Sequence, residues 1–138
     1  PGRVPTSLAR RVGVTVARFV LDTNIILYFL GGRLAEPFPA GAYAISVISE
    51  LELLAYPGLV SSEEQRIRDF LADVPITDLT QSVKHHAVSL RKRFGLKLPD
   101  AIVAATALAL EATLLTNDQR LLALSDVPTQ TLLVRPQS

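Results

Sequence analysis

The 138-residue sequence contains no cysteine, methionine or tryptophan, and its two histidines are the adjacent pair His85 and His86. The absence of cysteine excludes a disulfide scaffold, a thiolate metal site and a cysteine nucleophile. Two adjacent histidines argue against a zinc site built from several imidazoles. The 14 Lys and Arg nearly balance the 13 Asp and Glu, so bulk charge indicates no nucleic-acid partner. Any chemistry must therefore come from carboxylates, hydroxyls and amides.

Long hydrophobic runs are also missing, although 49% of the residues are hydrophobic and only 20% are charged. That composition is too apolar for a disordered chain and suits one globular domain. No apolar run approaches the ~20 residues needed to span a bilayer, and the first residues lack the apolar core of a signal peptide. We therefore expect a cytoplasmic protein. Residues 1–17 are expected to form an N-terminal extension, native or added for expression, and residues 18–138 the folded domain.

Short β-like runs alternate with helical patterns, which is typical of an α/β domain with a mostly parallel sheet. The predicted strands cover residues 18–22, 42–46, 74–78, 113–116 and 129–134. The predicted helices cover residues 23–30, 47–56, 80–94, 101–112 and 118–124, and residues 98–100 open the helix 101–112. A further predicted helix begins at an N-cap on Ser61 or Ser62 and extends to residue 74.

Three aspartates lie at the junctions of this pattern. Asp22 ends the first strand, Asp118 follows the fourth strand, and Asp100 lies in the first turn of a helix. Because sites form outside the carboxyl ends of parallel strands, such acids can converge although they are far apart in sequence. Nearby helix N-termini favour ionised carboxylates, which are the ligands of hard cations such as Mg²⁺ or Mn²⁺. The pattern therefore indicates a candidate metal site with oxygen ligands.

A fourth candidate acid comes from the predicted helix 47–56, which carries Glu50 and Glu52 among apolar residues. Residues two positions apart on a helix are separated by about 200° around its axis, so only one of the two glutamates can face the cleft. A charge in so apolar a helix is costly unless it is exposed, paired or bound to a metal. The apolar spacing alone does not decide between Glu50 and Glu52.

Each acid alone also has an ordinary structural explanation. Asp22 and Asp118 suit helix N-caps, and Asp100 complements the dipole of its helix. Three acids that independently reach the same edge of the sheet favour a functional site over three separate caps.

Four segments carry a family resemblance that extends over about residues 18–134. They are FVLDTNIIL (19–27), ISVISELELL (45–54), LPDAIVAAT (98–106) and LTND (115–118). In this order and spacing they resemble the PIN-domain family of metal-dependent ribonucleases, and most of all the VapC toxins of VapBC toxin–antitoxin pairs. The resemblance implies a single PIN-like domain, with a central sheet of four to five strands between layers of helices (three-layer α/β/α).

The resemblance also implies an activity and a set of site residues. It implies an endoribonuclease that hydrolyses RNA phosphodiester bonds with Mg²⁺ or Mn²⁺, as the toxin component of a type II toxin–antitoxin pair. The implied catalytic and metal-binding acids are Asp22, Glu52, Asp100 and Asp118, with Asn24, Thr116 and Asn117 in supporting positions. The family pattern of a Ser or Thr, two variable residues, Glu and Leu selects Glu52 over Glu50.

The implied partners are the RNA substrate, a cognate antitoxin protein that blocks the acidic cleft, and a second copy of the chain in a homodimer. The apolar helix 23–30 and residues 53–56 are candidate surfaces for the protein contacts. The residues Arg91, Lys92, Arg93 and Lys97 are possible RNA contacts. The preference of a helix C-terminus for cations explains the same residues equally well.

Three alternatives remain beside this interpretation. One is a PIN-domain nuclease of RNA processing that has no antitoxin, and another is a non-catalytic binding domain whose acids only cap helices. A haloacid-dehalogenase-like phosphatase would require a second aspartate two residues after Asp22, where Asn24 stands. His85 and His86 are interpreted as exposed or helix-packing residues, not as catalytic ones.

Overall fold

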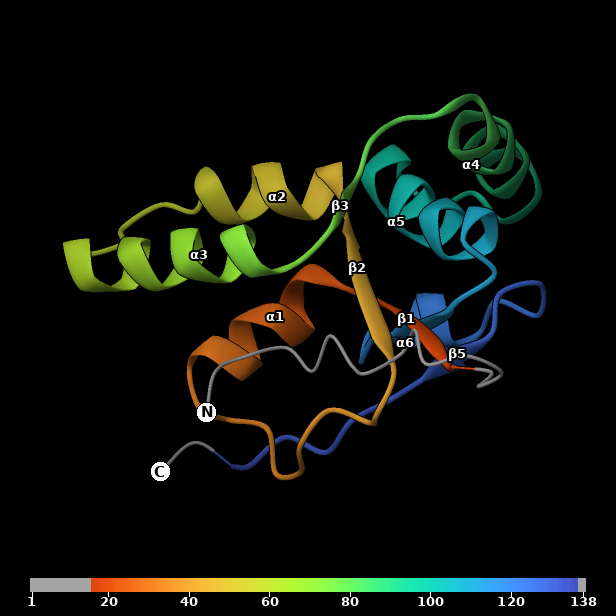
Figure 1. Ribbon diagram of the computed structural model, residues 1–138. Coiled ribbons are helices and arrows are strands. Elements are labelled where there is room, and N and C mark those ends of the chain that lie inside the picture. Colours follow the sequence, from red (N-terminus) through yellow and green to blue (C-terminus); the bar gives the residue numbers. More distant parts are fainter. Residues whose placement is uncertain (1–15, 137–138) are drawn as a thin grey trace.

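A five-stranded parallel sheet forms the centre of the protein, whose computed structural model describes residues 16–136 (Figure 1). The strands are β1 (Arg18–Leu21), β2 (Ala42–Ser46), β3 (Ile76–Thr77), β4 (Thr113–Leu115) and β5 (Thr129–Gln130). Their order in the sheet is β3-β2-β1-β4-β5, and every neighbouring pair is parallel. The predicted α/β fold is confirmed. Residues 1–15 of the expected N-terminal extension lie outside the described residues.

Six helices in residues 16–136 connect and cover the strands. They are α1 (Thr23–Leu30), α2 (Val47–Leu54), α3 (Ser61–Asp73), α4 (Gln81–Phe94), α5 (Leu98–Ala109) and α6 (Gln119–Leu122). In Figure 1, α2 and α3 extend together on one side of the molecule, and α4 packs beside α5 on the other. None of these helices is long and apolar enough to cross a membrane.

The core has two parts, one on each face of the sheet. Successive residues of a strand point to opposite faces. In β1 this places Val20 in a cluster with α4 and α5, and places Phe19 and Leu21 in a cluster with α1 and α3. Both parts contain fully buried residues. This burial on both faces explains why the strands read as apolar runs, and it confirms the three-layer α/β/α arrangement.

Several predicted boundaries are wrong by a few residues. The N-cap of α3 is Val60, not Ser61 or Ser62, and the Glu63 carboxylate accepts a hydrogen bond from the Val60 N–H at 3.1 Å. The last strand ends at Gln130 instead of residue 134. It is short because the Asn117 side chain, in place of a strand neighbour, bonds both backbone groups of Leu132.

The helix boundaries around α5 differ in a similar way. It begins at Leu98, with the proline in its first turn, and ends at Ala109 instead of residue 112. The chain turns away there because Glu111 adopts a left-handed backbone conformation, with φ of 53°. The preceding helix α4 ends as predicted at Gly95, which has φ of 69° and donates its N–H to the Arg91 carbonyl.

Candidate active site

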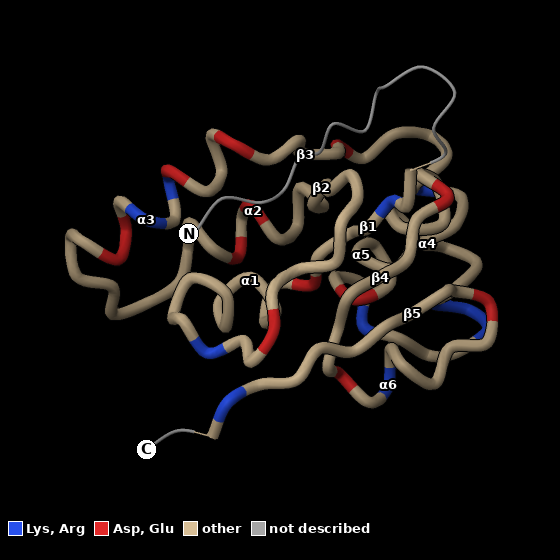
Figure 2. The backbone as a smooth tube through the Cα atoms, turned by 60° about the horizontal axis from the view of Figure 1, so that its bottom comes forward, with Lys and Arg blue, Asp and Glu red and all other residues tan. Residues whose placement is uncertain are grey.

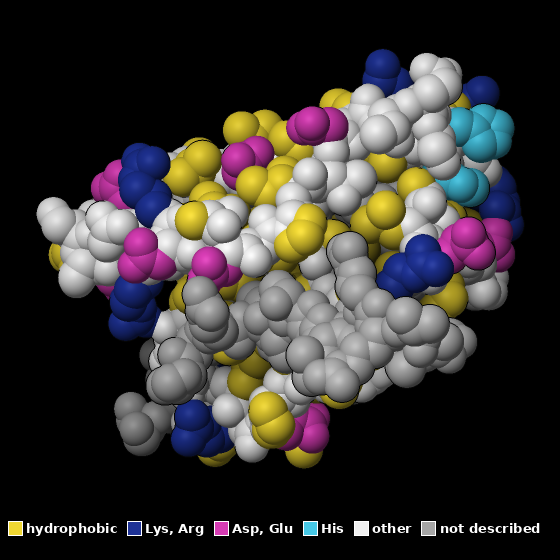
Figure 3. Space-filling view, viewed as in Figure 1, with side chains coloured by type: hydrophobic (Ala, Val, Ile, Leu, Met, Phe, Trp, Pro, Cys, Tyr) yellow, Lys and Arg dark blue, Asp and Glu magenta, His cyan; other side chains and the backbone are white. Residues whose placement is uncertain are grey.

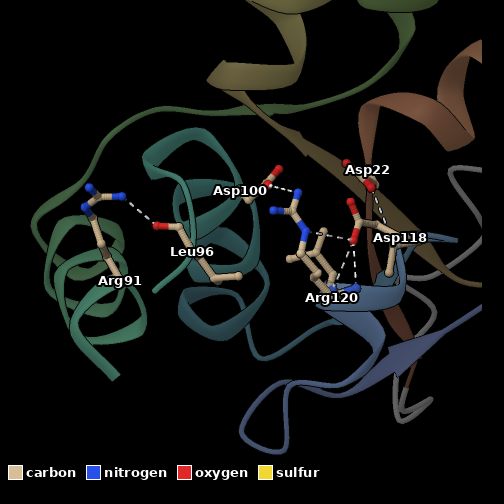
Figure 4. A network of polar contacts seen from close by, with 8 residues as sticks. Asp22, Arg91, Leu96, Asp100, Asp118 and Arg120 are labelled. Atoms are coloured by element: carbon tan, nitrogen blue, oxygen red, sulfur yellow. Dashed lines mark hydrogen bonds and ion pairs between the residues drawn. The ribbon is translucent and has the colours of Figure 1, made fainter. Parts of the chain in front are cut away.

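The three predicted aspartates come from three neighbouring elements. Asp22 follows β1 and caps α1, Asp118 follows β4 and caps α6, and Asp100 lies in the first turn of α5. Because β1 and β4 are adjacent parallel strands, their carboxyl ends bring Asp22 and Asp118 to the same edge of the sheet. Figure 4 shows the side chains of all three aspartates around one region.

Asp22 is the most buried of these acids, with 8% of its surface exposed. Its Oδ1 accepts a hydrogen bond from the Thr23 N–H at 2.8 Å, and its Oδ2 accepts one from the Thr116 hydroxyl at 2.7 Å. The pKa of Asp22 is raised, mainly by burial. The two hydrogen bonds offset part of this effect, and the charges of Asp100 and Asp118 add to it. The charges of Asp100 and Asp118 therefore act on the Asp22 carboxylate.

Thr116 connects two of the acidic positions. This residue is fully buried, and its hydroxyl donates to Asp22 while it accepts the N–H of Asp118 at 3.0 Å. A single hydroxyl, directly after β4, thus fixes the Asp22 carboxylate and the backbone that presents Asp118. This geometry suits the supporting role that we predicted for Thr116.

Glu52 reaches the site from α2 through Thr23. Its Oε1 accepts a hydrogen bond from the Thr23 hydroxyl at 2.6 Å, and the Ser49 hydroxyl lies 2.9 Å from the same Thr23 oxygen. Thr23 has one hydroxyl hydrogen, so it donates to the Glu52 carboxylate and accepts from Ser49. The Glu52 side chain is exposed on the surface of α2. Glu50, the other candidate on α2, makes no such contact in the described part of the chain.

Arg120 lies between two of the aspartates (Figure 4). Its Nη2 is 3.3 Å from Oδ2 of Asp100, and its Nε is 3.8 Å from Oδ1 of Asp118. The same Asp118 oxygen accepts the backbone N–H of Arg120 at 2.8 Å and that of Leu121 at 3.4 Å, as an N-cap does. Arg120 is therefore held near the acids by backbone and side chain together.

The two predicted supporting asparagines lie in different surroundings. The Asn117 side chain donates to the Leu132 carbonyl at 3.1 Å and accepts the Leu132 N–H at 3.2 Å, and it also accepts from the Thr131 hydroxyl. These bonds fasten the chain after β5, not an acid of the site. Asn24 is exposed on α1.

In the predicted basic segment, two side chains have partners within the described part of the chain and two make no ion pair there. Arg91 donates to the Leu96 carbonyl at 2.7 Å, which closes the loop between α4 and α5, and Arg93 pairs with Asp126. Lys92 and Lys97 are exposed and make no ion pair within residues 16–136. Figure 2 shows acidic and basic residues distributed over most of the backbone.

The histidine pair lies on α4, where His85 is exposed and His86 is half-buried. Figure 3 shows histidine side chains on one flank of the molecule beside Lys and Arg side chains. A hollow of about 470 Å³ along this helix is lined by Gln81, Lys84, His85, Val88, Ser89, Lys92 and Arg93. Its lining includes none of the acids described above.

The donor set fits a divalent cation in kind. Carboxylate oxygens are the ligands that Mg²⁺ and Mn²⁺ prefer. Burial raises the pKa of Asp22 and the charges of Asp100 and Asp118 add to this, and a bound cation would offset both effects. Within residues 16–136, however, no three His, Cys, Asp or Glu side chains are arranged to hold a metal ion as they stand. The Arg120 guanidinium lies between Asp100 and Asp118.

Sequence reasoning missed Thr23, Ser49 and Arg120. A signal for two of them was present, because Thr23 is adjacent to Asp22 and Ser49 is three residues before Glu52, on the same face of a helix. The position of Arg120 two residues after Asp118 carried no comparable signal.

Comparisons with known proteins identify the family and the fold. The family model described as PIN domain matches residues 19–127. The structure is similar to VapBC2 from Rickettsia felis bound to a DNA fragment from its promoter, at 20% identity over 83% of this chain and 98% of that one, with a TM-score of 0.69. It is also similar to VapBC-1 from nontypeable Haemophilus influenzae, at 24% identity over 83% and 97% of the two chains, with a TM-score of 0.61.

A third similar structure has a higher sequence identity. It is a toxin–antitoxin complex from Klebsiella pneumoniae, at 30% identity over 75% of this chain and 89% of that one, with a TM-score of 0.58. No curated protein matches the sequence. The resemblance carried by the four sequence segments is thus confirmed, and the chain belongs to the PIN domain family.

Proposed function

We propose that this chain is a metal-dependent endoribonuclease and the toxin component of a type II toxin–antitoxin pair. Membership of the PIN domain family and the likeness to toxin–antitoxin complexes support the proposal. The observation that carries it is the convergence of Asp22, Asp100 and Asp118, which are 78 and 18 residues apart in sequence (Figure 4). Burial raises the pKa of Asp22, and the charges of the other two aspartates add to this. Three separate helix caps would not need to share one edge of the sheet.

In the proposed site Asp22, Asp100 and Asp118 hold the cation. Bound Mg²⁺ or Mn²⁺ would supply Lewis-acid stabilisation of the phosphate and an activated water as nucleophile. Asp22 is fixed for this role because both of its oxygens accept a hydrogen bond, from Thr23 and from Thr116. Its burial withholds it from bulk water, which strengthens its interaction with a cation.

Glu52 has a different task in this scheme. Its side chain is exposed, and its Oε1 accepts a hydrogen bond of 2.6 Å from the Thr23 hydroxyl. A carboxylate held in this way can orient the attacking water or accept its proton. Ser49, fully buried beneath it, completes the chain of hydroxyls that fixes Thr23.

RNA would be held by basic side chains around the acids. Lys92 and Lys97 are the two members of the predicted basic segment whose ammonium groups have no carboxylate partner within the described residues, so they are available to phosphates. Arg91 and Arg93 have partners in the chain and are expected to contribute less. Lys84 lines the same hollow on α4 as Lys92 and adds a second lysine to it.

The proposed protein partners are the antitoxin and a second copy of this chain. An exposed apolar strip at the end of α2 and the start of α3 offers a surface for them, formed by Leu51, Leu54, Tyr56 and Val60. Of the predicted surface residues 53–56, Leu54 and Tyr56 are exposed, whereas Leu53 is fully buried in the core. In α1, Ile25 and Ile26 are buried toward the sheet, and the other residues are partly or fully exposed.

Expression in a bacterial host tests the toxin assignment. The full chain should arrest growth, and co-expression of the gene next to it should restore growth. Asp100→Asn should abolish the arrest, whereas Asp69→Asn, which alters an exposed aspartate on α3 that accepts a hydrogen bond from Gln65, should not. Growth arrest that Asp100→Asn leaves intact would exclude catalysis at these acids as its cause. Restoration by the neighbouring gene separates a toxin from a PIN nuclease of RNA processing, which needs no antitoxin.

A further inference from the structure

The cluster of aspartates already contains a cation that belongs to the chain. Arg120 extends from the first turn of α6, with its Nη2 3.3 Å from an Asp100 oxygen and its Nε 3.8 Å from an Asp118 oxygen. These two acids lie on different elements, 18 residues apart in sequence. The guanidinium is therefore the only link in residues 16–136 that joins the Asp100 side chain to the Asp118 side chain directly (Figure 4).

Charge explains why an arginine is placed there. Asp22, Asp100 and Asp118 bring three carboxylates to one region, and their repulsion contributes to the raised pKa of Asp22. Arginine stays protonated under all ordinary conditions, so Arg120 supplies a permanent positive charge against these acids. It does for Asp100 and Asp118 what a bound divalent cation would also do.

The contacts of Arg120 are loose enough to be exchanged. Each is a single contact at 3.3 Å or longer, not the two parallel hydrogen bonds of a bidentate pair, and the side chain is 60% exposed. Each exposed ion pair of this kind changes the equilibrium constant of a process that breaks it, such as the binding of a competing cation, by a factor of up to about five. Both acids also keep an oxygen without a hydrogen bond in the described part of the chain, namely Oδ1 of Asp100 and Oδ2 of Asp118.

We propose that Arg120 is an internal counter-ion of the acidic site, which competes with the divalent cation for Asp100 and Asp118 and is displaced when the cation binds. The inference rests on the proposed metal dependence of this site. The guanidinium holds the two carboxylates in place without a cation, and it lowers the apparent affinity for the cation by the free energy of the contacts that must break. Arg120 is thus a positioning residue of the site and not a catalytic one.

Calorimetric titration of the full-length, metal-free protein with Mn²⁺ tests the proposal. Arg120→Gln should bind Mn²⁺ about three- to tenfold more tightly than the wild type, since up to two exposed ion pairs no longer compete. The matched control is Arg68→Gln. It removes a guanidinium that is 58% exposed and pairs with Glu64 on α3, so its affinity for Mn²⁺ should equal that of the wild type.

Two further measurements distinguish direct competition at the two carboxylates from a long-range effect of the arginine charge. At about 1 M salt, where the Debye length is ~3 Å, the ratio of the Arg120→Gln and wild-type affinities should shrink but stay above one if the guanidinium contacts the two carboxylates, and should vanish if only long-range charge matters. In thermal unfolding, metal-free Arg120→Gln should melt at a lower temperature than the wild type and gain more from added Mn²⁺. Should Arg120→Gln fail to fold without metal, Arg120→Ala is compared at the same salt concentrations in its place, starting from the Mn²⁺-loaded protein and removing the ion by competition with a chelator.

The outcomes separate this inference from the proposed function. If the wild type binds Mn²⁺ and Arg120→Gln binds it equally or more weakly, Arg120 does not compete and the inference is wrong while the metal site stands. If the wild type binds no Mn²⁺ at all, both the metal dependence and the inference fail. Tighter binding by Arg120→Gln but not by Arg68→Gln, retained in part at high salt, supports both.

Discussion

The Thr116 hydroxyl donates a hydrogen bond of 2.7 Å to Oδ2 of Asp22, which joins the carboxyl ends of β4 and β1 at the acidic site. Both residues are buried, so water does not replace this bond when it is lost. Because the same hydroxyl accepts the N–H of Asp118, the bond also fixes the backbone of a second acid. This buried threonine is therefore expected to matter to activity as well as to stability.

Replacing Thr116 with valine keeps the shape of the side chain and removes the hydroxyl. The variant should lose about 1–3 kcal/mol of folding free energy, because a buried carboxylate loses a donor and the Asp118 N–H loses its acceptor. RNA cleavage should fall by about tenfold or more. Urea unfolding and an RNA cleavage assay check the two effects. Thr116→Ser restores the hydroxyl, so an inactive serine variant that is as stable as the wild type would contradict the assigned role.

The pH dependence of stability should reflect Asp22. Burial, with the charges of Asp100 and Asp118, raises the pKa of Asp22 above its ordinary value of 3.8. Such an acid binds more protons in the folded state than in the unfolded state between the two pKa values, so stability falls as pH rises through that interval. In the metal-free wild type, protonation of Asp22 thus favours folding below the interval, and this contribution is lost above it.

Asp22→Asn should remove this part of the pH dependence. At pH 7, in the presence of a chelator, the variant should be at least as stable as the wild type, although it should cleave no RNA. Thermal unfolding of both proteins between pH 4 and pH 8 measures the difference. A metal-free Asn variant that is clearly less stable at pH 7 would show that the hydrogen bonds of Asp22 outweigh its burial.

The two glutamates of α2 offer a matched pair of substitutions. Glu52→Gln should reduce cleavage by at least about tenfold, because Glu52 is the one held at the site by Thr23, whereas Glu50→Gln should leave cleavage within about twofold. Stability should change by less than ~0.5 kcal/mol in Glu52→Gln, whose side chain is exposed. Cleavage rates of the two purified variants at the same Mn²⁺ concentration decide the matter. A larger loss in Glu50→Gln would reverse the choice.

Asn117 is expected to act on stability alone. Asn117→Ala removes the bonds to both backbone groups of Leu132, which should cost about 2 kcal/mol of folding free energy. Cleavage at a temperature where the variant remains folded should stay within about twofold of the wild-type rate. Chemical denaturation and cleavage at low temperature measure these two quantities. A large loss of cleavage in the folded variant would restore the supporting role that its position beside Asp118 suggested.

Much of this organisation could be predicted because it follows from periodic patterns. Apolar runs bounded by glycine, proline and acids located every strand, and the junction positions of Asp22, Asp100 and Asp118 placed them at the same edge of a parallel sheet. The choice between Glu50 and Glu52 needed the family pattern, since spacing in the helix left it open. The contact of Glu52 with Thr23 gives that choice a physical basis.

Other features depend on side-chain geometry that a linear pattern does not carry. The end of β5 at Gln130 depends on one amide, that of Asn117, in competition with a longer strand. The position of Arg120 among the acids depends on the turn that Asp118 begins by capping α6. Neither can be predicted from spacing, because both result from contacts between segments brought together by the fold.

Cleavage of a structured RNA by the purified chain is the most direct test of a metal-dependent ribonuclease. With Mn²⁺ the wild type should produce discrete fragments, and a chelator should stop the reaction until excess Mn²⁺ is restored. Asp100→Asn, shown to be folded by circular dichroism, should produce none, whereas Asp69→Asn should cut like the wild type. Cleavage that continues in the chelator, or that Asp100→Asn retains in full, would contradict a metal-dependent site at these aspartates.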